Sequence, residues 1–215
     1  VWASLATLLK TGDRLVASKA LFGSCHVVCM ELLPKFGVKS IMVNGTSLDE
    51  WEQALSTPTT AVFIETPSNP QMDLIDIETV SELAHKAGAK VVVDNVFATP
   101  ILQKPIELGA DIVVYSATKH IDGQGRAMGG AILTNDLGYA DGDLLQFLRH
   151  TGPALSPFNA WTLLKGLETL EFRMAQHCAN AREIAKYLTT ISRLVKVIYP
   201  GLKSHPQYDL CKKQM

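Results

Sequence analysis

The stretch KVVVDNVFATPILQKPIELGADIVVYS, residues 90–116, contains two nearly continuous apolar runs that are rich in β-branched residues, one at 91–93 and one at 112–115. Strands that are covered on both faces of a sheet have this pattern, whereas half-exposed strands alternate apolar and polar residues. The segment between the two runs is long enough for a crossover connection between parallel strands. The stretch therefore predicts an α/β fold with a mostly parallel sheet.

The same alternation of strands and helices extends on both sides of this stretch. Further strands are predicted at residues 14–18, 38–43, 61–65 and 129–133, and helices at residues 1–10, 24–36, 48–55 and 76–89. In the last of these helices Ile77, Val80, Leu83 and Ala84 recur at helical spacing, and a glycine near its end is a common stop signal. Strands and helices that alternate in this way support the α/β prediction.

Beyond residue 155 the pattern becomes helical. Residues 156–191 carry helical periodicity over a longer span than one globular helix usually has, which is typical of a long helix that links two domains. The run VKVIYPGL, residues 195–202, then predicts the first strand of another domain. We therefore predict a large α/β domain over residues 1–155, an interdomain helical segment over 156–191 and the start of a smaller C-terminal α/β domain over 192–215.

The composition excludes several classes of protein. The chain has 215 residues, is 47% hydrophobic and carries 20 Lys and Arg against 21 Asp and Glu, so it can bury a substantial core and has no basic surplus for nucleic acid. No apolar run approaches the roughly 18 residues that a membrane span needs, and no signal peptide opens the chain. The four cysteines form no CxxC pair and are expected to be free thiols. These features predict a soluble, cytoplasmic protein.

Polar residues follow three of the predicted strands at the point where each strand ends. Glu65 and the loop TPSNP end one strand, Asp94 with Asn95 ends the valine run, and Ser116 to Lys119 end the third. In open parallel sheets, ligands bind outside the carboxyl ends of the strands. We therefore expect these residues to meet at one edge of the sheet.

Taken singly, Asp94 and Lys119 also allow ordinary interpretations. A carboxylate behind three valines is costly to bury unless a cation or strong donor pairs with it, but Asp is also common as a helix N-cap or turn residue. Most lysines are solvated surface groups. Lys119, however, follows the hydroxyl residues Ser116 and Thr118, and a lysine at the rim of a desolvated pocket can act as a nucleophile or base. These residues are candidates for a catalytic site.

The glycine-rich segment GQGRAMG, residues 123–129, has a spacing similar to that of a dinucleotide-binding loop. That motif directly follows a strand and opens a helix, whereas here TKHID intervenes and a strand follows. The phosphate-loop motif GxxxxGK is absent. We interpret these glycines as a place where the backbone passes close to a ligand and turns back into the next strand.

No metal site is predicted, because the histidines form no ligand pair or Cys/His cluster by spacing. The histidines are His26, His85, His120, His150, His177 and His205. In the helical segment Glu168 and Glu171 lie near Lys165 and Arg173, and this mixture of charges indicates a solvated face.

Several segments, taken together and in order, resemble the Cys/Met metabolism (trans-sulfuration) family of pyridoxal-phosphate-dependent enzymes. The similar segments are SKALFGS (18–24), FIETPSNP (63–70), VVVDNVFATP (91–100), ADIVVYSATKHIDGQGRAMGG (110–130), LSPFNAWTLLKGLETLEFRM (155–174) and YPGL (199–202). So many matches in family order are not expected by chance. The resemblance implies the fold type I of PLP-dependent transferases, the aspartate aminotransferase-like fold, with pyridoxal 5'-phosphate bound in the large domain.

Carried over residue by residue, the resemblance implies that Lys119 forms the Schiff base with the cofactor aldehyde. Asp94 would pair with the pyridinium nitrogen, which gives the lysine and acid arrangement that this cofactor requires. A nearby carboxylate keeps the ring nitrogen protonated, and the protonated ring is an electron sink for a carbanion. Ser116 and Thr118 would hold the cofactor phosphate through their hydroxyl groups.

The resemblance assigns three further residues. Phe22 stands where much of the family has a tyrosine stacked on the cofactor ring, so stacking is retained while phenol proton chemistry is lost. Asn69 would contact the ring oxygen of the cofactor. Ser156 would lie near the amino-acid end of the substrate.

Within the family, TKHIDGQGR, DNVFATP and the LFGS form most resemble members that replace the γ-substituent of O-succinylhomoserine with sulfide. This resemblance implies a transferase of methionine biosynthesis that releases homocysteine and succinate. A cystathionine γ-synthase, which uses cysteine in place of sulfide, or a γ-lyase would share the same cofactor residues. A rival of a different class is a non-catalytic α/β binding domain, which would bind no cofactor.

The resemblance also implies parts that these residues do not include. The chain starts at Val1 inside an apolar run and ends at Met215 without a terminating pattern, so we expect a piece of a longer protein. The expected missing parts are an amino-terminal segment that reaches the neighbouring subunit's cofactor phosphate, a phosphate-binding glycine turn and the arginine for the substrate carboxylate. The piece alone is expected to show little or no activity. The family is typically a homotetramer of two dimers with active sites at the dimer interface, and we expect the same here.

Overall fold

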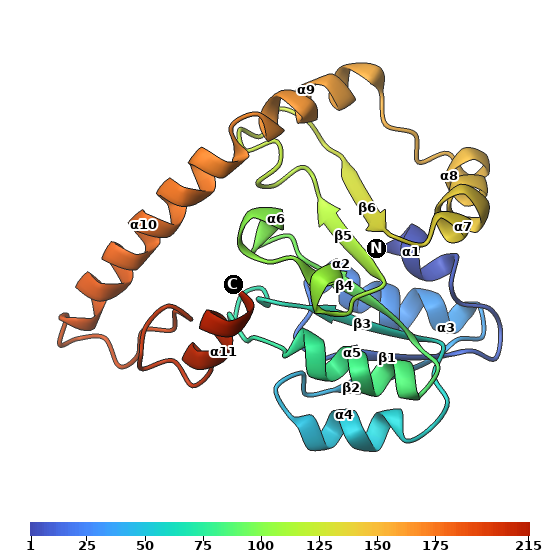
Figure 1. The fold of residues 1–215 in the computed structure, drawn as a ribbon, viewed down its shortest axis with the longest axis horizontal. Helices are drawn as coiled ribbons and strands as arrows, with labels where there is room; N and C mark the ends of the chain where they lie inside the picture. Colours follow the sequence, from blue (N-terminus) through green and yellow to red (C-terminus); the bar gives the residue numbers. More distant parts are fainter.

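The computed structural model describes all residues from Val1 to Met215 and has a six-stranded sheet at its centre (Figure 1). The strand order is β2-β1-β3-β4-β5-β6. β1 to β5 pair in parallel and β6 pairs antiparallel with β5, which confirms the predicted mostly parallel sheet. The strands are β1 Arg14–Ser18, β2 Lys39–Val43, β3 Ala61–Glu65, β4 Lys90–Asp94, β5 Ile112–Ser116 and β6 Gly130–Thr134.

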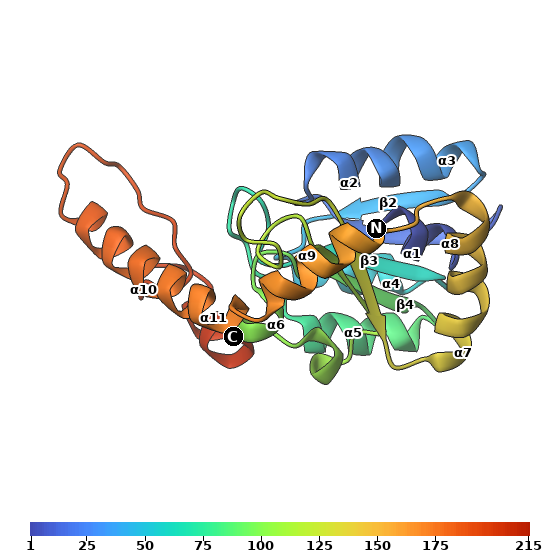
Figure 2. The same cartoon turned by 90° about the horizontal axis from the view of Figure 1, so that it is seen from above.

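Helices cover both faces of the sheet (Figure 2). α1 and the continuous segment α2–η1–α3 lie on one face, α4 and α5 lie on the other, and α10 extends away from these layers. None of the helices combines the length and the apolar character needed to cross a membrane. The helices are α1 Trp2–Ala6, α2 Gly23–Val27, η1 Val28–Leu32, α3 Leu33–Lys35, α4 Leu48–Leu55, α5 Ile77–Lys86, α6 Thr99–Leu102, η2 Pro105–Leu108, α7 Leu137–Tyr139, η3 Ala140–Leu144, α8 Leu145–Thr151, α9 Pro157–Leu167, α10 Leu170–Thr189 and α11 Tyr208–Gln214.

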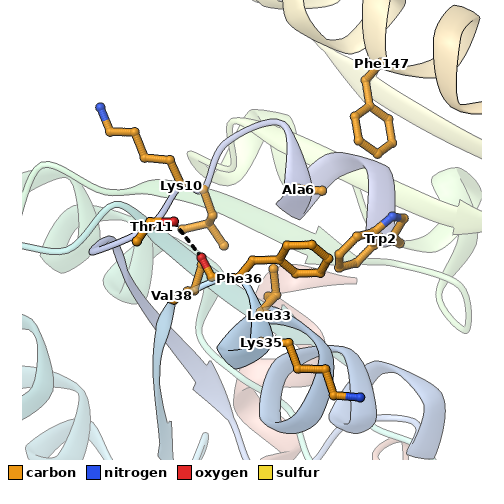
Figure 3. Close-up of a pocket in the computed structure, with 11 residues that line it drawn as sticks. Trp2, Ala6, Lys10, Thr11, Leu33, Lys35, Phe36, Val38 and Phe147 are labelled. Carbon is orange, nitrogen blue, oxygen red and sulfur yellow. Dashed lines mark hydrogen bonds between the residues drawn. The ribbon is translucent and has the colours of Figure 1, made fainter.

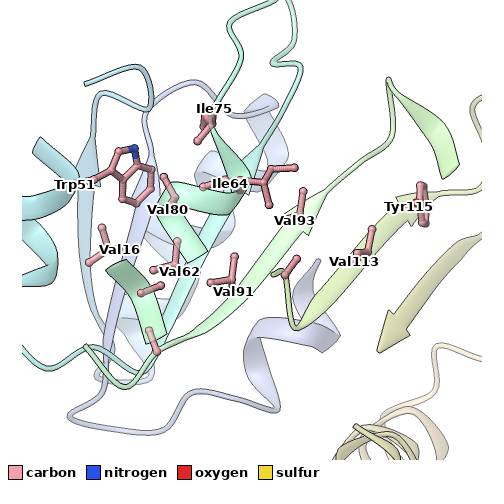
Figure 4. Packing of buried hydrophobic residues seen from close by; sticks show 14 of the residues in the cluster. Val16, Trp51, Val62, Ile64, Ile75, Val80, Val91, Val93, Val113 and Tyr115 are labelled. Atoms are coloured by element: carbon pink, nitrogen blue, oxygen red, sulfur yellow. The ribbon is translucent and has the colours of Figure 1, made fainter. Parts of the chain in front are cut away.

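The side chains of the strands alternate between two apolar cores, one on each face of the sheet. One core joins Val62 of β3 to Trp51 of α4 and Val80 of α5 (Figure 4). The other core joins Phe63, the next residue of β3, to Leu33 of α3. All five residues of β3 are buried, because both of its faces are covered. This double coverage is the reason that the strand sequences are continuously apolar.

The strand order reverses between β1 and β3. The chain leaves β1 through helices on one face to reach β2, and then passes back through α4 on the other face to reach β3. In open α/β sheets such a reversal opens a crevice outside the carboxyl ends of the strands, where ligands bind. The fold therefore favours a site next to the ends of β1 and β3.

Two of the predicted helices differ in detail from the structure. The helix predicted over residues 1–10 ends early, at Ala6, and the hydroxyl of the next residue, Thr7, donates to the Ala3 carbonyl at 2.7 Å beside the helical N–H bond, an arrangement that slightly destabilises helices. The helix predicted over 24–36 is present but widens into the π-helical segment η1 just before Pro34. Proline has no N–H and its ring crowds the carbonyl four residues earlier, so regular α-helical bonds cannot continue through it.

The segment predicted as one long helix over residues 156–191 forms two helices instead. α9 and α10 are separated by a bend at Thr169, whose backbone is not helical (φ −117°, ψ 3°). The Arg173 guanidinium donates to the Gly166 carbonyl at 2.8 Å and to the Thr169 hydroxyl at 3.1 Å. These bonds add a charged donor to the Gly166 carbonyl, which otherwise accepts only long bonds from Thr169 (3.4 Å), and they stabilise the bend.

Residues 195–202, which were predicted as a strand, form no strand in the structure. A strand needs a neighbour for its backbone N–H and C=O groups, and the single six-stranded sheet offers none here. After this segment α11 packs back onto the α/β layers. The side-chain oxygens of Gln207 and Gln214 accept the backbone N–H groups of Leu74 (2.8 Å) and Ile77 (3.1 Å). The domain boundaries remain predictions.

Candidate active site at the carboxyl ends of the strands

Neighbouring parallel strands bring most of the candidate residues to one edge of the sheet. Asn69 follows β3, Asp94 closes β4, and Lys119 follows β5. Phe22 follows β1, and its backbone N–H is hydrogen-bonded to Glu65 at the end of β3. Because β1, β3, β4 and β5 are consecutive in the sheet, these residues lie at the same edge of the sheet, where the reversal of strand order is expected to open a crevice.

Asp94 is buried at this edge, with only 7% of its surface exposed. One carboxylate oxygen, Oδ1, accepts the Val96 N–H at 3.1 Å, which is the bond expected of a turn residue. The other oxygen, Oδ2, accepts no hydrogen bond from the chain, and no Lys, Arg or His side chain pairs with the group. Burial raises the pKa of Asp94 to about 6. The turn interpretation therefore accounts for one oxygen and leaves the other for a donor from a ligand.

Lys119 lies in the turn that follows β5. Its backbone N–H donates to the Ser116 carbonyl at 3.1 Å, and its own carbonyl accepts the Gly123 N–H at 2.8 Å. The side chain is exposed and makes no ion pair or hydrogen bond within the chain. An amine held on an ordered turn and free of partners is available for covalent chemistry.

The two hydroxyl groups before Lys119 differ in their bonding. The Ser116 hydroxyl has no hydrogen-bond partner in the chain, so it is free to bind an anion. The Thr118 hydroxyl accepts the Gly129 N–H at 3.1 Å and donates to the Gly129 carbonyl at 3.3 Å. Thr118 therefore ties the lysine turn to the start of β6, and it would have to give up its long bond to the carbonyl in order to donate to a ligand.

Phe22 and Asn69 flank the crevice from two loops. Phe22 precedes α2, and 48% of its surface is exposed, so its ring is available to a ligand. Asn69 is half-buried in the loop after β3. The backbone N–H groups of both residues donate to the Glu65 carboxylate, at 2.6 Å for Phe22 and 3.0 Å for Asn69.

Ser156 lies at the first turn of α9, and its hydroxyl is already used. It accepts the Asn159 N–H at 3.1 Å as the N-cap of the helix. The Asn159 side chain in turn donates to the Met128 carbonyl at 3.3 Å. The structure thus places Ser156 beside the segment that leads into β6, with a capping role of its own.

Arg173 is a residue of this region that sequence reasoning assigned to a solvated face. Its guanidinium donates to the His120 carbonyl at 2.8 Å and to the Ile121 carbonyl at 3.3 Å, directly after Lys119. Gly166 of α9 approaches the same loop so closely that an added Cβ would lie 2.0 Å from the Ile121 oxygen. Arg173 therefore fastens the lysine turn to the bend between α9 and α10. In the sequence Arg173 is one of several charged residues in a helical segment, and nothing there predicts its contact with the lysine turn.

Replacing Arg173 with alanine is expected to destabilise the protein by about 2 kcal/mol, because it leaves the carbonyls of His120 and Gly166 without a charged donor. Urea unfolding measures this change. The matched control is Arg182→Ala on the same helix, which removes an exposed arginine that makes no hydrogen bond and should change stability by less than about 0.5 kcal/mol. Equal effects of the two substitutions would contradict the role of Arg173.

The glycine-rich segment after the lysine forms a tight turn. Gly123 and Gly125 have positive φ angles of 72° and 67°, which favour glycine. The buried Asp122 carboxylate accepts the backbone N–H groups of Gln124 (3.1 Å) and Arg126 (2.8 Å). The glycines therefore allow the chain to turn back into β6. The turn is unsuited to binding a phosphate, because the Asp122 carboxylate at its centre would repel the anion.

A cavity of about 650 Å³ lies at the opposite edge of the sheet (Figure 3). It is lined by Thr11 and Val38, which precede β1 and β2, and by Trp2 and Phe36, whose ring centroids are 5.7 Å apart. Since β1 and β2 are parallel, this is the amino end of the strands. None of the candidate residues lies there, so the cavity is not part of the candidate site.

Similarity to known proteins covers the whole chain. The profile of the Cys/Met metabolism PLP-dependent enzyme family matches residues 1–215. This chain is 60% identical to the O-succinylhomoserine sulfhydrylase of Mycobacterium tuberculosis and 44% identical to that of Pseudomonas aeruginosa. Each match covers 100% of this chain and 53% of the relative. An L-methionine gamma-lyase of Fusobacterium nucleatum is 40% identical over 99% of this chain and 54% of the relative. The chain thus spans about half the length of the curated relatives it matches.

Solved structures show the same fold. A cystathionine gamma synthase from Xanthomonas oryzae superposes with a TM-score of 0.95 and 36% identity over 99% of this chain and 55% of that chain. A cystathione gamma lyase from Micromonospora echinospora superposes with a TM-score of 0.96 and 33% identity over 100% of this chain and 56% of that chain. These matches confirm the predicted fold type. The chain belongs to the Cys/Met metabolism family of pyridoxal-phosphate-dependent enzymes.

Proposed function

We propose that the intact protein is a transferase that replaces the succinyloxy group of O-succinylhomoserine with sulfide, giving homocysteine and succinate. The observation that carries this proposal is the 60% identity, over every residue of the chain, to an O-succinylhomoserine sulfhydrylase, against 40% to a methionine gamma-lyase. Family membership also argues against a non-catalytic binding domain. The reaction belongs to methionine biosynthesis, and the setting that fits it is the cytoplasm.

The residues at the strand ends fit pyridoxal 5'-phosphate. Asp94 is a buried residue whose second carboxylate oxygen accepts no hydrogen bond from the chain, and a protonated ring nitrogen would supply both a donor and a compensating charge. The unpaired amine of Lys119 would hold the cofactor covalently. The free hydroxyl of Ser116, assisted by Thr118, would bind the phosphate, while Phe22 would stack on the ring and Asn69 would contact its oxygen substituent.

The proposed mechanism uses Lys119 as the base for more than one proton transfer. When bound, the cofactor supplies an electron sink for negative charge that develops at the substrate Cα. The Lys119 amine, set free when the substrate amine takes its place, would take the Cα proton and pass it on to the cofactor, and, neutral again, would take a Cβ proton. Succinate leaves Cγ with the bonding electron pair, sulfide adds to Cγ, and Lys119 returns protons to Cβ and Cα. Its exposed position on a turn gives the amine the reach to serve both carbons. Ser156 would lie near the amino-acid end of the substrate.

We propose that the assembly is a homotetramer of two dimers, with each active site at a dimer interface. The apolar face of α9 supports this assignment, because Phe158, Trp161 and Leu164 recur at helical spacing and are 71%, 55% and 57% exposed. Exposed apolar patches of this kind are typical of contact surfaces between subunits.

The proposed reaction is tested by supplying the intact, cofactor-loaded protein with O-succinylhomoserine and one of three acceptors. Sulfide should give homocysteine at a higher kcat/KM than cysteine gives cystathionine, and water alone should give little 2-oxobutyrate. A preference for cysteine would indicate a cystathionine γ-synthase. Rapid release of 2-oxobutyrate from O-succinylhomoserine, or of methanethiol from methionine, would indicate a γ-lyase. This is the main alternative, because one of the relatives is a methionine gamma-lyase.

A further inference from the structure

Glu65 is a buried carboxylate that no catalytic role accounts for. It is the last residue of β3 and only 5% of its surface is exposed. Its Oε2 atom accepts the Phe22 N–H at 2.6 Å, and its Oε1 atom accepts the Asn69 N–H at 3.0 Å. One side chain thus connects the two loops that carry the proposed ring contacts.

The surroundings of Glu65 contain no compensating cation. No Lys, Arg or His side chain pairs with it, and the register of β3 and β4 places Asp94 directly opposite it. Burial and the nearby charge of Asp94 raise the pKa of Glu65 to about 7, although its two backbone hydrogen bonds oppose the shift. A charge at this position is costly to bury, so its presence calls for a reason other than packing.

The bonding geometry supplies that reason. An ionised carboxylate has only acceptors, so it can receive two N–H groups from two different segments at once. A glutamine has one oxygen and one NH₂ group, and the NH₂ group would face one of the two N–H donors. An apolar residue of similar size would satisfy neither. Glu65 also connects the loop after β1, which contains Phe22, to the loop after β3, which contains Asn69. The strand order reverses between these two strands.

We propose that Glu65 is a positioning residue that fixes Phe22 and Asn69 against the cofactor ring by clamping their backbone amides across the crevice between β1 and β3. The inference rests on the proposed site, in which these two residues contact the ring. Glu65 itself acts through the two loops and takes no part in proton transfer.

The test measures how tightly the intact protein, stripped of cofactor, binds pyridoxal 5'-phosphate, by titrating the visible absorbance of the lysine-bound cofactor. Glu65→Gln should weaken binding about tenfold to a hundredfold, because one of the two charge-assisted bonds is lost and its loop is released. Glu65→Asp keeps two acceptors on a shorter side chain and should fall between the wild type and Glu65→Gln. The matched control is Glu50→Gln, which also removes a carboxylate that accepts a backbone N–H (from Asn44, at 2.7 Å) but lies on the outer side of α4, where 41% of its side chain is exposed. The control should bind the cofactor as the wild type does.

A double-mutant cycle separates positioning from a general loss of structure. In a Phe22→Ala/Asn69→Ala background the clamp has nothing left to position, so adding Glu65→Gln should weaken binding by no more than about twofold. An equal loss in both backgrounds, or wild-type affinity of Glu65→Gln, would overturn the inference. Should Glu65→Gln not fold, Glu65→Asp is compared in the same two backgrounds. A wild-type protein that develops no visible band would instead refute the proposed function, so the two failures are distinguishable.

Discussion

Replacing Lys119 with alanine is expected to abolish the visible absorbance of the bound cofactor and to lower kcat by at least about 10³-fold. The reason is that Lys119 is proposed both to hold the cofactor covalently and to move the protons at Cα and Cβ, and general acid–base catalysis alone contributes about 10²–10⁴-fold. The structure supports this choice, because the amine is exposed on an ordered turn and has no other partner. Absorbance spectra and steady-state assays of the intact protein measure both effects.

The control for this substitution is Lys104→Ala, which removes another exposed lysine whose only ion pair is with Glu107 on the surface, at 3.3 Å. It should leave the spectrum and the turnover unchanged. A Lys119→Ala protein that retains the visible band and normal turnover would show that another lysine holds the cofactor. Loss of the band in both variants would indicate a general defect in folding.

Asp94→Asn is expected to have the second largest effect on activity. A carboxylate beside a cation raises the pKa of that cation by about 1 to 3 units, so the amide would reduce the protonated fraction of the ring nitrogen by about 10- to 1,000-fold. We expect kcat to fall within that range while the cofactor remains attached to Lys119. The measurement is a steady-state assay together with the absorbance spectrum. Unchanged turnover would mean that Asp94 is only the turn residue that its bond to Val96 indicates.

The same substitution should stabilise the cofactor-free protein. Burial raises the pKa of Asp94 from 3.8 to about 6, so the folded protein resists ionisation of this group more than the unfolded chain does. The resulting stability is complete below pH 4 and is lost as the pH rises through about 6. At pH 8, Asp94→Asn should therefore be more stable than the wild type by up to about 3 kcal/mol, and near pH 4 the difference should vanish. Urea unfolding at the two pH values checks this, and a destabilised variant at pH 8 would contradict it.

The strands and the position of the crevice could be predicted because burial on both faces leaves a direct trace in the sequence. The valine run before Asp94 and the apolar run before Ser116 are continuous since both cores require apolar residues there. Parallel pairing then places the residues after each strand at one edge, so Asp94 and the Lys119 turn could be identified as neighbours. The residue roles within the crevice came from a family resemblance and remain proposals.

The contacts that hold this crevice together could not be predicted, because they join residues that are distant in sequence. Glu65 was recognisable only as a charge at a strand end, and its bonds to two loops depend on the tertiary arrangement. Arg173 looks like any charged helical residue, although it bonds the lysine turn more than 50 residues away. Its contacts with Gly166 and Thr169 also explain why a continuous helical pattern contains a bend. Residues 195–202 have a strand-like composition but no neighbouring strand, and pairing decides the outcome.

The most direct test of the account is to locate the covalent attachment of the cofactor. The intact protein is loaded with pyridoxal 5'-phosphate, reduced with borohydride so that the bond to the lysine becomes permanent, digested and analysed by mass spectrometry. The account predicts the phosphopyridoxyl group on Lys119, in the peptide that contains the sequence YSATKHID, and on no other lysine in stoichiometric amount. Stoichiometric modification of a different lysine, with Lys119 unmodified, would contradict it.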